Sequence, residues 1–291
     1  MKRGKSRRLF KKKKSHSNQR LGCIIAIIVL IPICYGLYLY YQQYSVQHSS
    51  KPQIETSVSL PTPSGKDLEI PISLIPRQEQ IIRHKGYTVS YNKDLKIPNW
   101  VSYELTRQET KGKEKRGDNF IADPLVKGAI ATNADYARSG YDKGHMAPAA
   151  DMKWSPDVMK ESFYFSNMCP QHPQLNRRGW KNLEEKIRDW AADSAIIIIC
   201  GPIIDKPSKT IGKNKVAVPE RFFKVILSPF VKPARGIGFL FNNRQAVEPL
   251  STYAVSIDSI EKLTHMDFFS PLPDEIENAV EANADYYQWP R

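Results

Sequence analysis

The sequence has few cysteines and none of the spacings by which cysteine and histidine bind a structural zinc ion. It contains four cysteines in 291 residues, with no Cys-x-x-Cys pair and no Cys/His zinc pattern. Cys23 and Cys34 lie in a long apolar run, which leaves Cys169 and Cys200 for a folded domain. These two predict either a disulfide in an oxidising compartment or two buried free thiols, and both alternatives stay open.

Acidic residues are absent from the first 20 residues, which hold ten of the 43 lysines and arginines. Without this segment the net charge falls from +13 to +3. The high overall charge therefore describes the N-terminal tail, and it is weak support for a nucleic-acid surface on the folded part.

An uncharged run rich in isoleucine, leucine, valine and tyrosine extends from Leu21 to Tyr41. A helix of about 20 residues is long enough to cross a bilayer, and no Ala-x-Ala cleavage site follows the run. We therefore predict an uncleaved membrane anchor at residues 21–41. Because lysine and arginine prefer the cytoplasmic side, residues 1–20 are expected in the cytoplasm and the rest in the periplasm or outside the cell.

The remainder has the composition of one tethered globular domain. Residues 42–67 are rich in Ser, Gln, Pro and Thr without a hydrophobic period, which is typical of a solvated linker. Residues 68–280 have the length of a single domain, and residues 281–291 are expected to form a C-terminal tail.

Hydrophobic periodicity in this domain predicts strands and helices together. Helices are expected at residues 177–192, where Trp180, Leu183, Ile187 and Trp190 have helical spacing, and at residues 256–264. The charged run at residues 109–118 is expected to be an exposed loop. Strands are expected at residues 68–75, 87–91, 100–105, 162–166, 195–200, 219–227 and 236–241, with 162–166 and 195–200 inside a central sheet.

Two glycines and a proline crowd one histidine, His145, between Ser139 and Asp151. Such a sequence fixes the backbone around a side chain that can take up a proton near neutral pH. A structural histidine is the more common interpretation of such a residue when it is taken alone. A second group of polar residues then follows, namely Asn167, Gln171, Asn176, Glu184 and Arg188.

Together the two segments resemble the DNA/RNA non-specific endonuclease family. The Asp-Arg-Gly-His signature of that family matches Asp142 to His145. Its Ser-Asn, Pro-Gln, Leu-Asn, Trp and Leu-Glu elements match residues 166–184 in order and spacing. The resemblance extends from about Leu68 to about Glu277.

This resemblance implies an α+β fold in which helices flank a central antiparallel sheet and a ββα-metal motif forms the active site, here preceded by the transmembrane helix. His145 would be the general base that activates water, and Asn176 the direct ligand of Mg²⁺, with Mn²⁺ or another divalent cation as alternatives. One asparagine suffices because Mg²⁺ keeps several waters and accepts one or two protein oxygens. Glu184 would hold water beside the metal.

Basic residues are expected to neutralise the scissile phosphate. Arg188 lies one helical turn after Glu184, so the two share a helix face, and a solvated ion pair is the alternative interpretation. Arg116 in the charged loop is the second candidate. Lys143 occupies the position where the signature has arginine, so the charge is kept and the bidentate fork is lost.

Three further residues match family positions near the site. The amides of Asn167 and Gln171 would position the histidine or the substrate, and turn-capping beside Pro170 is an equally open alternative. Asp142 either contacts substrate or orients the hairpin.

These assignments predict a metal-dependent endonuclease that hydrolyses DNA, RNA or both. The resemblance further implies that the 3′ oxygen is the leaving group, so that the products carry 5′ phosphates. Sequence preference should be low because phosphate contacts carry no base information. The alternative is a catalytically weak module that tethers nucleic acid at the membrane. No Gly-x-Ser-x-Gly, His-Glu-x-x-His or phosphate-loop pattern occurs, which argues against other hydrolases. A homodimer, as formed by family relatives, stays open.

Overall fold

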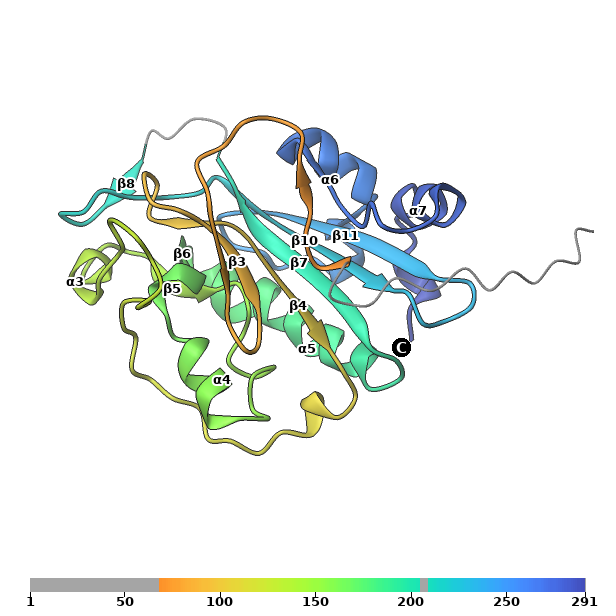
Figure 1. The fold of residues 1–291 in the computed structure, drawn as a ribbon, viewed down its shortest axis with the longest axis horizontal. Helices are drawn as coiled ribbons and strands as arrows, with labels where there is room; N and C mark the ends of the chain where they lie inside the picture. Colours follow the sequence, from red (N-terminus) through yellow and green to blue (C-terminus); the bar gives the residue numbers. More distant parts are fainter. Residues whose placement is uncertain (1–67, 205–208, 291) are drawn as a thin grey trace, which may run out of the picture. The chain divides into compact units, whose positions relative to one another are not determined.

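A seven-stranded antiparallel sheet forms the centre of the computed structural model, which describes residues 68–204 and 209–290 (Figure 1). Its strand order is β12-β11-β10-β7-β4-β3-β2. All neighbours pair antiparallel, as expected. The strands are β2 Gln80–Arg83, β3 Thr88–Asn92, β4 Ile97–Leu105, β7 Ile196–Ile203, β10 Arg221–Ser228, β11 Arg235–Asn242 and β12 Ala254–Val255.

Three two-stranded sheets and several helices surround it. The small sheets pair β1 Ile72–Ser73 with β13 Met266–Asp267, β5 Asp142–His145 with β6 Met168–Gln171, and β8 Thr210–Ile211 with β9 Val216–Ala217. The α-helices of the described residues are α3 Asn133–Tyr136, α4 Pro156–Glu161, α5 Lys181–Ala191, α6 Ile257–Thr264 and α7 Asp274–Glu281. Shorter helical turns are η1 Glu109–Lys111, η2 Phe165–Asn167, η3 Leu175–Trp180, η4 Leu250–Tyr253 and η5 Tyr286–Gln288.

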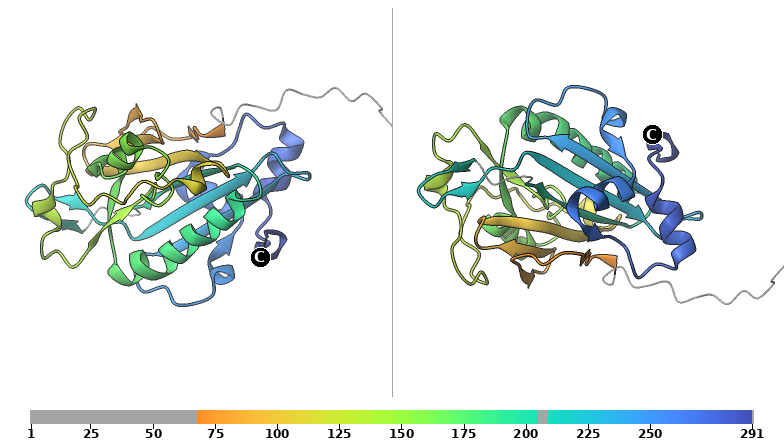
Figure 2. Two further views of the ribbon diagram at one scale, coloured as in Figure 1. Left: turned by 90° about the horizontal axis from the view of Figure 1, so that it is seen from below. Right: turned by 90° about the horizontal axis from the view of Figure 1, so that it is seen from above.

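Alternating side chains of the central strands supply two separate cores. In β7, Ile196, Ile198 and Cys200 lie in one core, and Ile197 and Ile199 lie in the other. Helix α5 and the β5–β6 hairpin cover the first face of the sheet, while α6 and α7 cover the second (Figure 1, Figure 2). Both faces of β7 are buried, which explains why its sequence is a continuous apolar run.

The β5–β6 hairpin leads directly into the long helix. The turn η3 has π-helical geometry and continues without a break into α5. Gly179 allows this turn to approach the rest of the domain, since a Cβ there would lie 2.6 Å from the Ala246 Cβ. Strands β5 and β6 and the helical segment η3–α5 are therefore neighbours in space, in the ββα order that the resemblance implies.

Most predicted elements are present, and one is wrong. Strands β3, β4, β7, β10 and β11 and helices η3–α5 and α6 lie where they were expected, whereas residues 68–75 contain only the short β1. Residues 162–166 are not a strand of the sheet. Their aromatic side chains are buried, but the backbone forms turns, with Phe163 N donating to Lys160 O at 3.1 Å, and its backbone–backbone bonds outside the turns go to Ile121 alone in the described chain. A single isolated bridge joins Tyr164 to Ile121.

Residues 281–290, the described part of the expected C-terminal tail, pack against α5. The ring centroids of Trp289 and Trp190 are 4.6 Å apart, and Trp190 Nε1 donates to Pro290 O at 2.9 Å. The predicted basic tail, anchor and tether lie outside the described residues. Within the described ranges, no helix has the length and apolarity that a membrane span requires.

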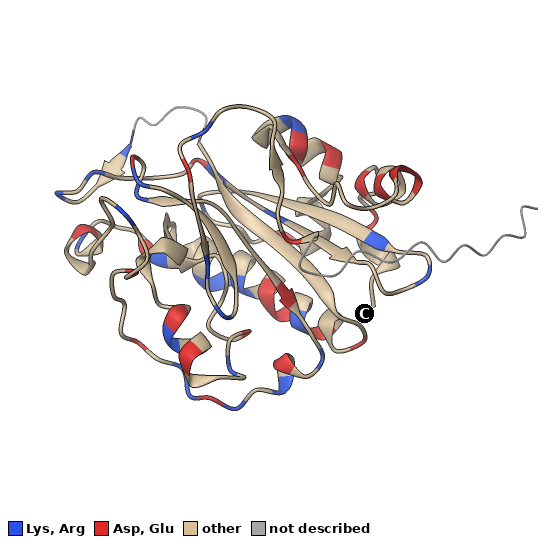
Figure 3. Ribbon diagram, viewed as in Figure 1, with Lys and Arg blue, Asp and Glu red and all other residues tan. Residues whose placement is uncertain are grey.

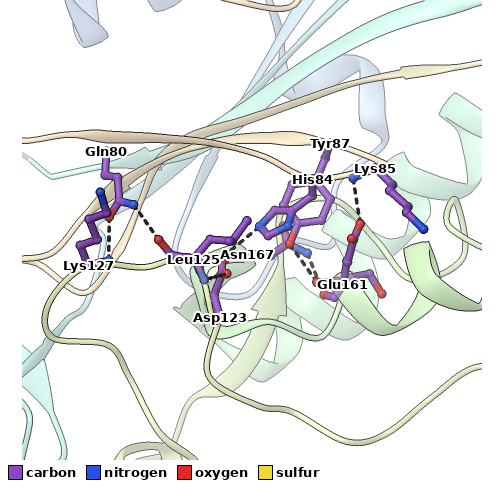
Figure 4. A network of polar contacts seen from close by, with 11 residues as sticks. Gln80, His84, Lys85, Tyr87, Asp123, Leu125, Lys127, Glu161 and Asn167 are labelled. Atoms are coloured by element: carbon purple, nitrogen blue, oxygen red, sulfur yellow. Dashed lines mark hydrogen bonds and ion pairs between the residues drawn. The ribbon is translucent and has the colours of Figure 1, made fainter.

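A buried carboxylate fastens the loop before the histidine hairpin to the neighbouring elements (Figure 4). Asp123 Oδ2 lies 2.9 Å from His84 Nε2 and accepts from Ser166 Oγ at 2.6 Å, and Oδ1 accepts from Leu125 N at 2.9 Å. Burial alone would raise the pKa of Asp123, but these hydrogen bonds outweigh it and lower the pKa. The carboxylate is therefore a structural anion.

Replacing this carboxylate should destabilise the fold. Asp123→Ala is expected to lower the free energy of unfolding by about 3–5 kcal/mol, because it leaves buried partners unpaired. The contribution is present above the unfolded-state pKa of about 3.9 and is lost as the pH falls through the lower folded-state pKa. Urea denaturation followed by tryptophan fluorescence measures the change. Asp94→Ala, at an exposed position, is the control and should cost under about 0.5 kcal/mol; equal losses would contradict the prediction.

Candidate active site

His145 ends strand β5, and three neighbours fix its backbone. It pairs with Met168 across the hairpin. Its carbonyl oxygen accepts from Trp180 Nε1 at 3.2 Å, which ties the hairpin to η3. The preceding Gly144 has to lack a side chain, because a Cβ there would lie 2.4 Å from Gln171 Oε1.

Aromatic rings surround the imidazole of His145. Its ring centroid lies 5.1 Å from that of Phe163, edge-on, and 5.6 Å from that of Phe120. The residue is 8% exposed, and Nε2 has no hydrogen-bond partner among the described residues. Burial lowers the pKa of His145 to about 3, and the positive charge of Arg116 acts in the same direction. The imidazole is therefore neutral at neutral pH, the form that accepts a proton.

Four side chains of the helical segment η3–α5 recur at intervals of four residues and share one face: Asn176, Trp180, Glu184 and Arg188. Trp180, through its bond to the His145 carbonyl, shows that this face is turned toward the hairpin. The geometry thus brings the predicted base, metal ligand and carboxylate to one hairpin–helix unit.

Asp142 joins the two parts of this unit. Its Oδ2 accepts from Asn176 Nδ2 at 3.0 Å and from Arg177 Nε at 2.7 Å, and its Oδ1 accepts from Arg177 Nη2 at 2.7 Å. Burial opposes the charged form, but the bonds from Arg177 and Asn176 outweigh it and lower the pKa of Asp142. Of the two alternatives for Asp142, these contacts favour orientation of the hairpin. The contact of Asn176 uses its amide nitrogen, so its amide oxygen stays available to bind a metal ion.

Glu184 lies beside a buried lysine that the sequence analysis missed. Lys224 Nζ is 3.9 Å from Glu184 Oε1 and 4.4 Å from the centre of the Trp180 ring. Lys224 is fully buried, and within the described chain neither its Nζ nor Glu184 Oε1 has a hydrogen-bond partner. The available signal was a single charge inside the apolar run 222–227, where strand alternation turns Lys224 toward α5.

From the sequence, the alternative interpretation was a solvated ion pair between Glu184 and Arg188. In the structure Arg188 pairs with the buried Asp151. Arg188 Nη1 bonds to Asp151 Oδ1 at 2.8 Å, and Tyr103 donates to Asp151 Oδ2 at 2.8 Å. The side chain of Glu184 is 12% exposed and that of Arg188 is 21% exposed, so neither is a solvated surface charge. Burial raises the pKa of Glu184 to about 7, and the charge of Lys224 lowers it in opposition.

Two cations flank the aromatic rings around His145. The exposed guanidinium of Arg116 lies 5.4 Å from the centre of the Phe163 ring. Lys143 Nζ lies 4.3 Å from the centre of the Phe120 ring and donates to Asn133 Oδ1 at 3.0 Å. A phosphate that approaches His145 would meet both charges.

Comparison with known proteins identifies the family to which this arrangement belongs. Residues 64–275 match the model of the DNA/RNA non-specific endonuclease family. A nuclease of Nostoc sp. is 30% identical over 250 residues, with 80% of this chain and 88% of that protein covered. The chain belongs to the DNA/RNA non-specific endonuclease family.

Other relatives agree with this assignment. Human mitochondrial endonuclease G is 34% identical over 213 residues, with 67% of this chain and 71% of that protein covered. A chain in the crystal structure of the EndoG/EndoGI complex superimposes with a TM-score of 0.62 at 28% identity, covering 68% of this chain and 89% of that one. The prediction of an endonuclease is confirmed.

In this endonuclease the amide of Asn167 contacts backbone. Its Oδ1 accepts from Ala147 N at 2.9 Å, and its Nδ2 donates to Ala147 O at 2.8 Å and Ser162 O at 2.9 Å. Asn167 therefore positions the chain two residues beyond His145. Gln171 is fully buried, and its two amide atoms have no hydrogen-bond partner in the described ranges. Its side chain packs over Gly144.

Both cysteines of the described endonuclease domain are free and buried. Cys200 Sγ donates to Met146 O at 3.2 Å, at the residue that follows His145. Burial raises the pKa of Cys200 to about 12 and raises that of Cys169 as well. The structure has the two buried thiols that were one of the two alternatives.

Removing the charge of Lys224 should raise the pKa of Glu184 further, by roughly one unit, because Lys224 is the strongest charge that lowers it. Carbon NMR of the glutamate carboxyl in Lys224→Met, with chelator present, measures the shift. Glu184 has a raised folded-state pKa, so its contribution to stability is present below the unfolded-state value and is lost as the pH rises through about 7. In Lys224→Met the folded-state pKa of Glu184 is higher, so the loss of stability should continue to a higher pH than in the parent. Lys181→Met, exposed on the same helix, is the control, and an unchanged titration in Lys224→Met would refute the coupling.

Proposed function

We propose that this endonuclease hydrolyses phosphodiester bonds of DNA, RNA or both with little sequence preference, and that neutral His145 takes a proton from the attacking water. One observation carries the proposal. A buried, neutral His145, whose Nε2 has no hydrogen-bond partner among the described residues, lies on the same hairpin–helix unit as Asn176 and Glu184. A base, two oxygen donors and nearby cations are what in-line attack on a phosphodiester requires.

The donor set fits a hard divalent cation such as Mg²⁺ or Mn²⁺. Asp142 accepts from the amide nitrogen of Asn176, and the amide oxygen makes no hydrogen bond within the described chain. Glu184 Oε1 is buried and has no hydrogen-bond partner in the described part of the chain, although Lys224 Nζ lies 3.9 Å away. Both are the oxygen ligands that such cations prefer. Asn176 would hold the ion and Glu184 would orient water beside it; when bound, the ion supplies positive charge to the phosphate oxygens.

Substrate binding should also activate the base. His145 Nε2 has no accessible surface, so the loop that carries Arg116 and Phe120 has to move slightly for water and phosphate to reach it. A phosphate beside Arg116 offsets one of the two causes that lower the pKa of His145. Arg116 and Lys143 supply charge to the phosphate, and Arg188 adds to it from its ion pair with Asp151.

A plasmid-nicking assay tests the proposal. The parent should cleave with magnesium and not with excess chelator. His145→Ala should lose at least about 10²–10⁴-fold in rate, because proton transfer to a positioned base contributes that much, and Asn176→Ala should require far more magnesium. His265→Asn is the control, since His265 is exposed beyond α6 in a left-handed conformation that asparagine tolerates.

Two results would contradict the proposal. A near-normal rate in His145→Ala would remove this histidine from the mechanism, and an unchanged magnesium titration in Asn176→Ala would require another ligand. Folded protein that binds DNA without cutting it would favour the tethering module. Lys143→Arg, which restores the signature, would then show whether the lost guanidinium fork is the cause.

We also propose that residues 21–41 anchor the enzyme in a membrane, with the basic tail in the cytoplasm and the nuclease domain in the periplasm or outside the cell. The uncharged apolar run and the ten basic residues before it support this orientation. Deleting residues 1–41 should move the nuclease activity from the membrane fraction to the soluble fraction without lowering specific activity. Full-length enzyme in the soluble fraction, or protected from protease added to spheroplasts, would refute the proposal.

A further inference from the structure

Five carboxylates gather on the face of the sheet opposite the histidine hairpin. Asp258 and Glu261 lie three residues apart on α6, and Glu277 and Glu281 lie four apart on α7, so each pair shares a helix face. Figure 3 shows acidic residues on both helices. Asp267 of β13 is the fifth, and all four other carboxylates act electrostatically on Glu281. One oxygen each of Asp258, Glu261 and Glu281 lies within 4.8 Å of the others.

Glu281 is the unusual member of this group. It is 6% exposed, and its Oε1 is buried with no hydrogen-bond partner among the described residues. Within the same ranges no lysine or arginine forms an ion pair with any of the five carboxylates. A buried carboxylate among like charges and without a partner is strongly disfavoured in its ionised form. Burial and the surrounding carboxylates accordingly raise the pKa of Glu281 to about 9.

We propose that Asp258, Glu261 and Glu281 bind a calcium-sized divalent cation, at a site separate from the catalytic one. Ca²⁺ binds oxygens at about 2.3–2.6 Å, so two ligands on opposite sides of one ion are about 4.6–5.2 Å apart. One oxygen of each of the three residues lies within 4.8 Å of the other two, so a single ion of this size can reach all three. Ca²⁺ accepts carboxylate oxygens in flexible geometry, whereas Mg²⁺ requires near-ideal octahedral geometry at about 2.0–2.1 Å and keeps several of its waters.

The position of the site gives it a structural consequence. Helices α6 and α7 pack on the second face of the sheet, and both contact β11. Glu261 is oriented by Phe268 N, which donates to its Oε1 at 2.8 Å. The carboxylates of α6 and α7 repel one another, and a cation bound between them attracts both helices. It therefore stabilises the C-terminal part of the domain, away from the β5–β6 hairpin.

Thermal unfolding of the full-length chain tests the site. The Asn176→Ala variant serves as parent, so that the proposed catalytic metal does not contribute. Calcium at about 10 mM, compared with chelator, should raise the melting temperature by about 3–10 °C if the affinity is of the order typical of extracellular calcium sites. Adding Glu281→Gln should abolish the rise, whereas Glu275→Gln, exposed on the same helix, should keep it.

Calorimetric titration of the same parent with calcium should give one bound ion, and none after Glu281→Gln. If that variant does not fold, Asp258→Asn provides the same comparison at a half-buried position. The proposal would be overturned if calcium did not raise the melting temperature of the parent, or if it raised that of Glu281→Gln and Glu275→Gln equally. Either result would indicate that the carboxylates share protons and do not bind a cation.

Discussion

The geometry of the active site depends on Trp180. Its indole N–H donates to the His145 carbonyl, its ring lies under Lys224 Nζ, and it contacts Phe222 and Phe241 of the sheet. A hairpin of two four-residue strands is not stable on its own. One buried side chain therefore fixes the hairpin to the helix and the helix to the sheet, and the relative positions of base, amide and carboxylate follow from it.

Both faces of the sheet hold buried polar atoms that have no hydrogen-bond partner among the described residues. His145 Nε2, Glu184 Oε1 and Lys224 Nζ lie on one face and Glu281 Oε1 on the other. Each such atom costs about 1–3 kcal/mol when it stays unpaired, and more when it is charged. Most buried polar groups in native proteins are hydrogen-bonded. The cations proposed above would complete the bonding of the two glutamates. The rest of the domain supplies the necessary stability through its two cores.

The parts of this fold that were predicted share a strong local signal. The isoleucine run at residues 195–200 and the helical period from Trp180 to Trp190 are recognisable because burial repeats along the element itself. Residues 162–166 have the same apolar character, yet they form turns, since burial of Phe163 and Phe165 does not require a ladder. Helix α7 was missed because four of its eight residues are acidic and, of its two large apolar residues, Val280 is buried while Ile276 is exposed.

The site was predictable where residue type and order carry it. His145, Asn176 and Glu184 stand in a signature, whereas Lys224 and Glu281 acquire their roles only through contacts with residues distant in the sequence. Asp142 shows the intermediate case: the sequence placed it at the site, but only the structure reveals that Asn176 and Arg177 occupy its oxygens. Residues in the signature can be recognised from the local sequence, whereas the contacts of Lys224 and Glu281 are tertiary and have no local sequence pattern.

The low pKa of His145 is consistent with a base that acts only on bound substrate. In the free protein, burial and the charge of Arg116 keep the imidazole neutral but weakly basic. A phosphate beside Arg116 brings an anion next to the ring, which favours the imidazolium that forms as water is deprotonated. Lys143 keeps its charge near the same rings through Phe120 and Asn133, so the electrostatic part of this coupling survives the loss of the arginine fork. In the proposed mechanism the histidine would therefore become more basic when a phosphodiester is bound.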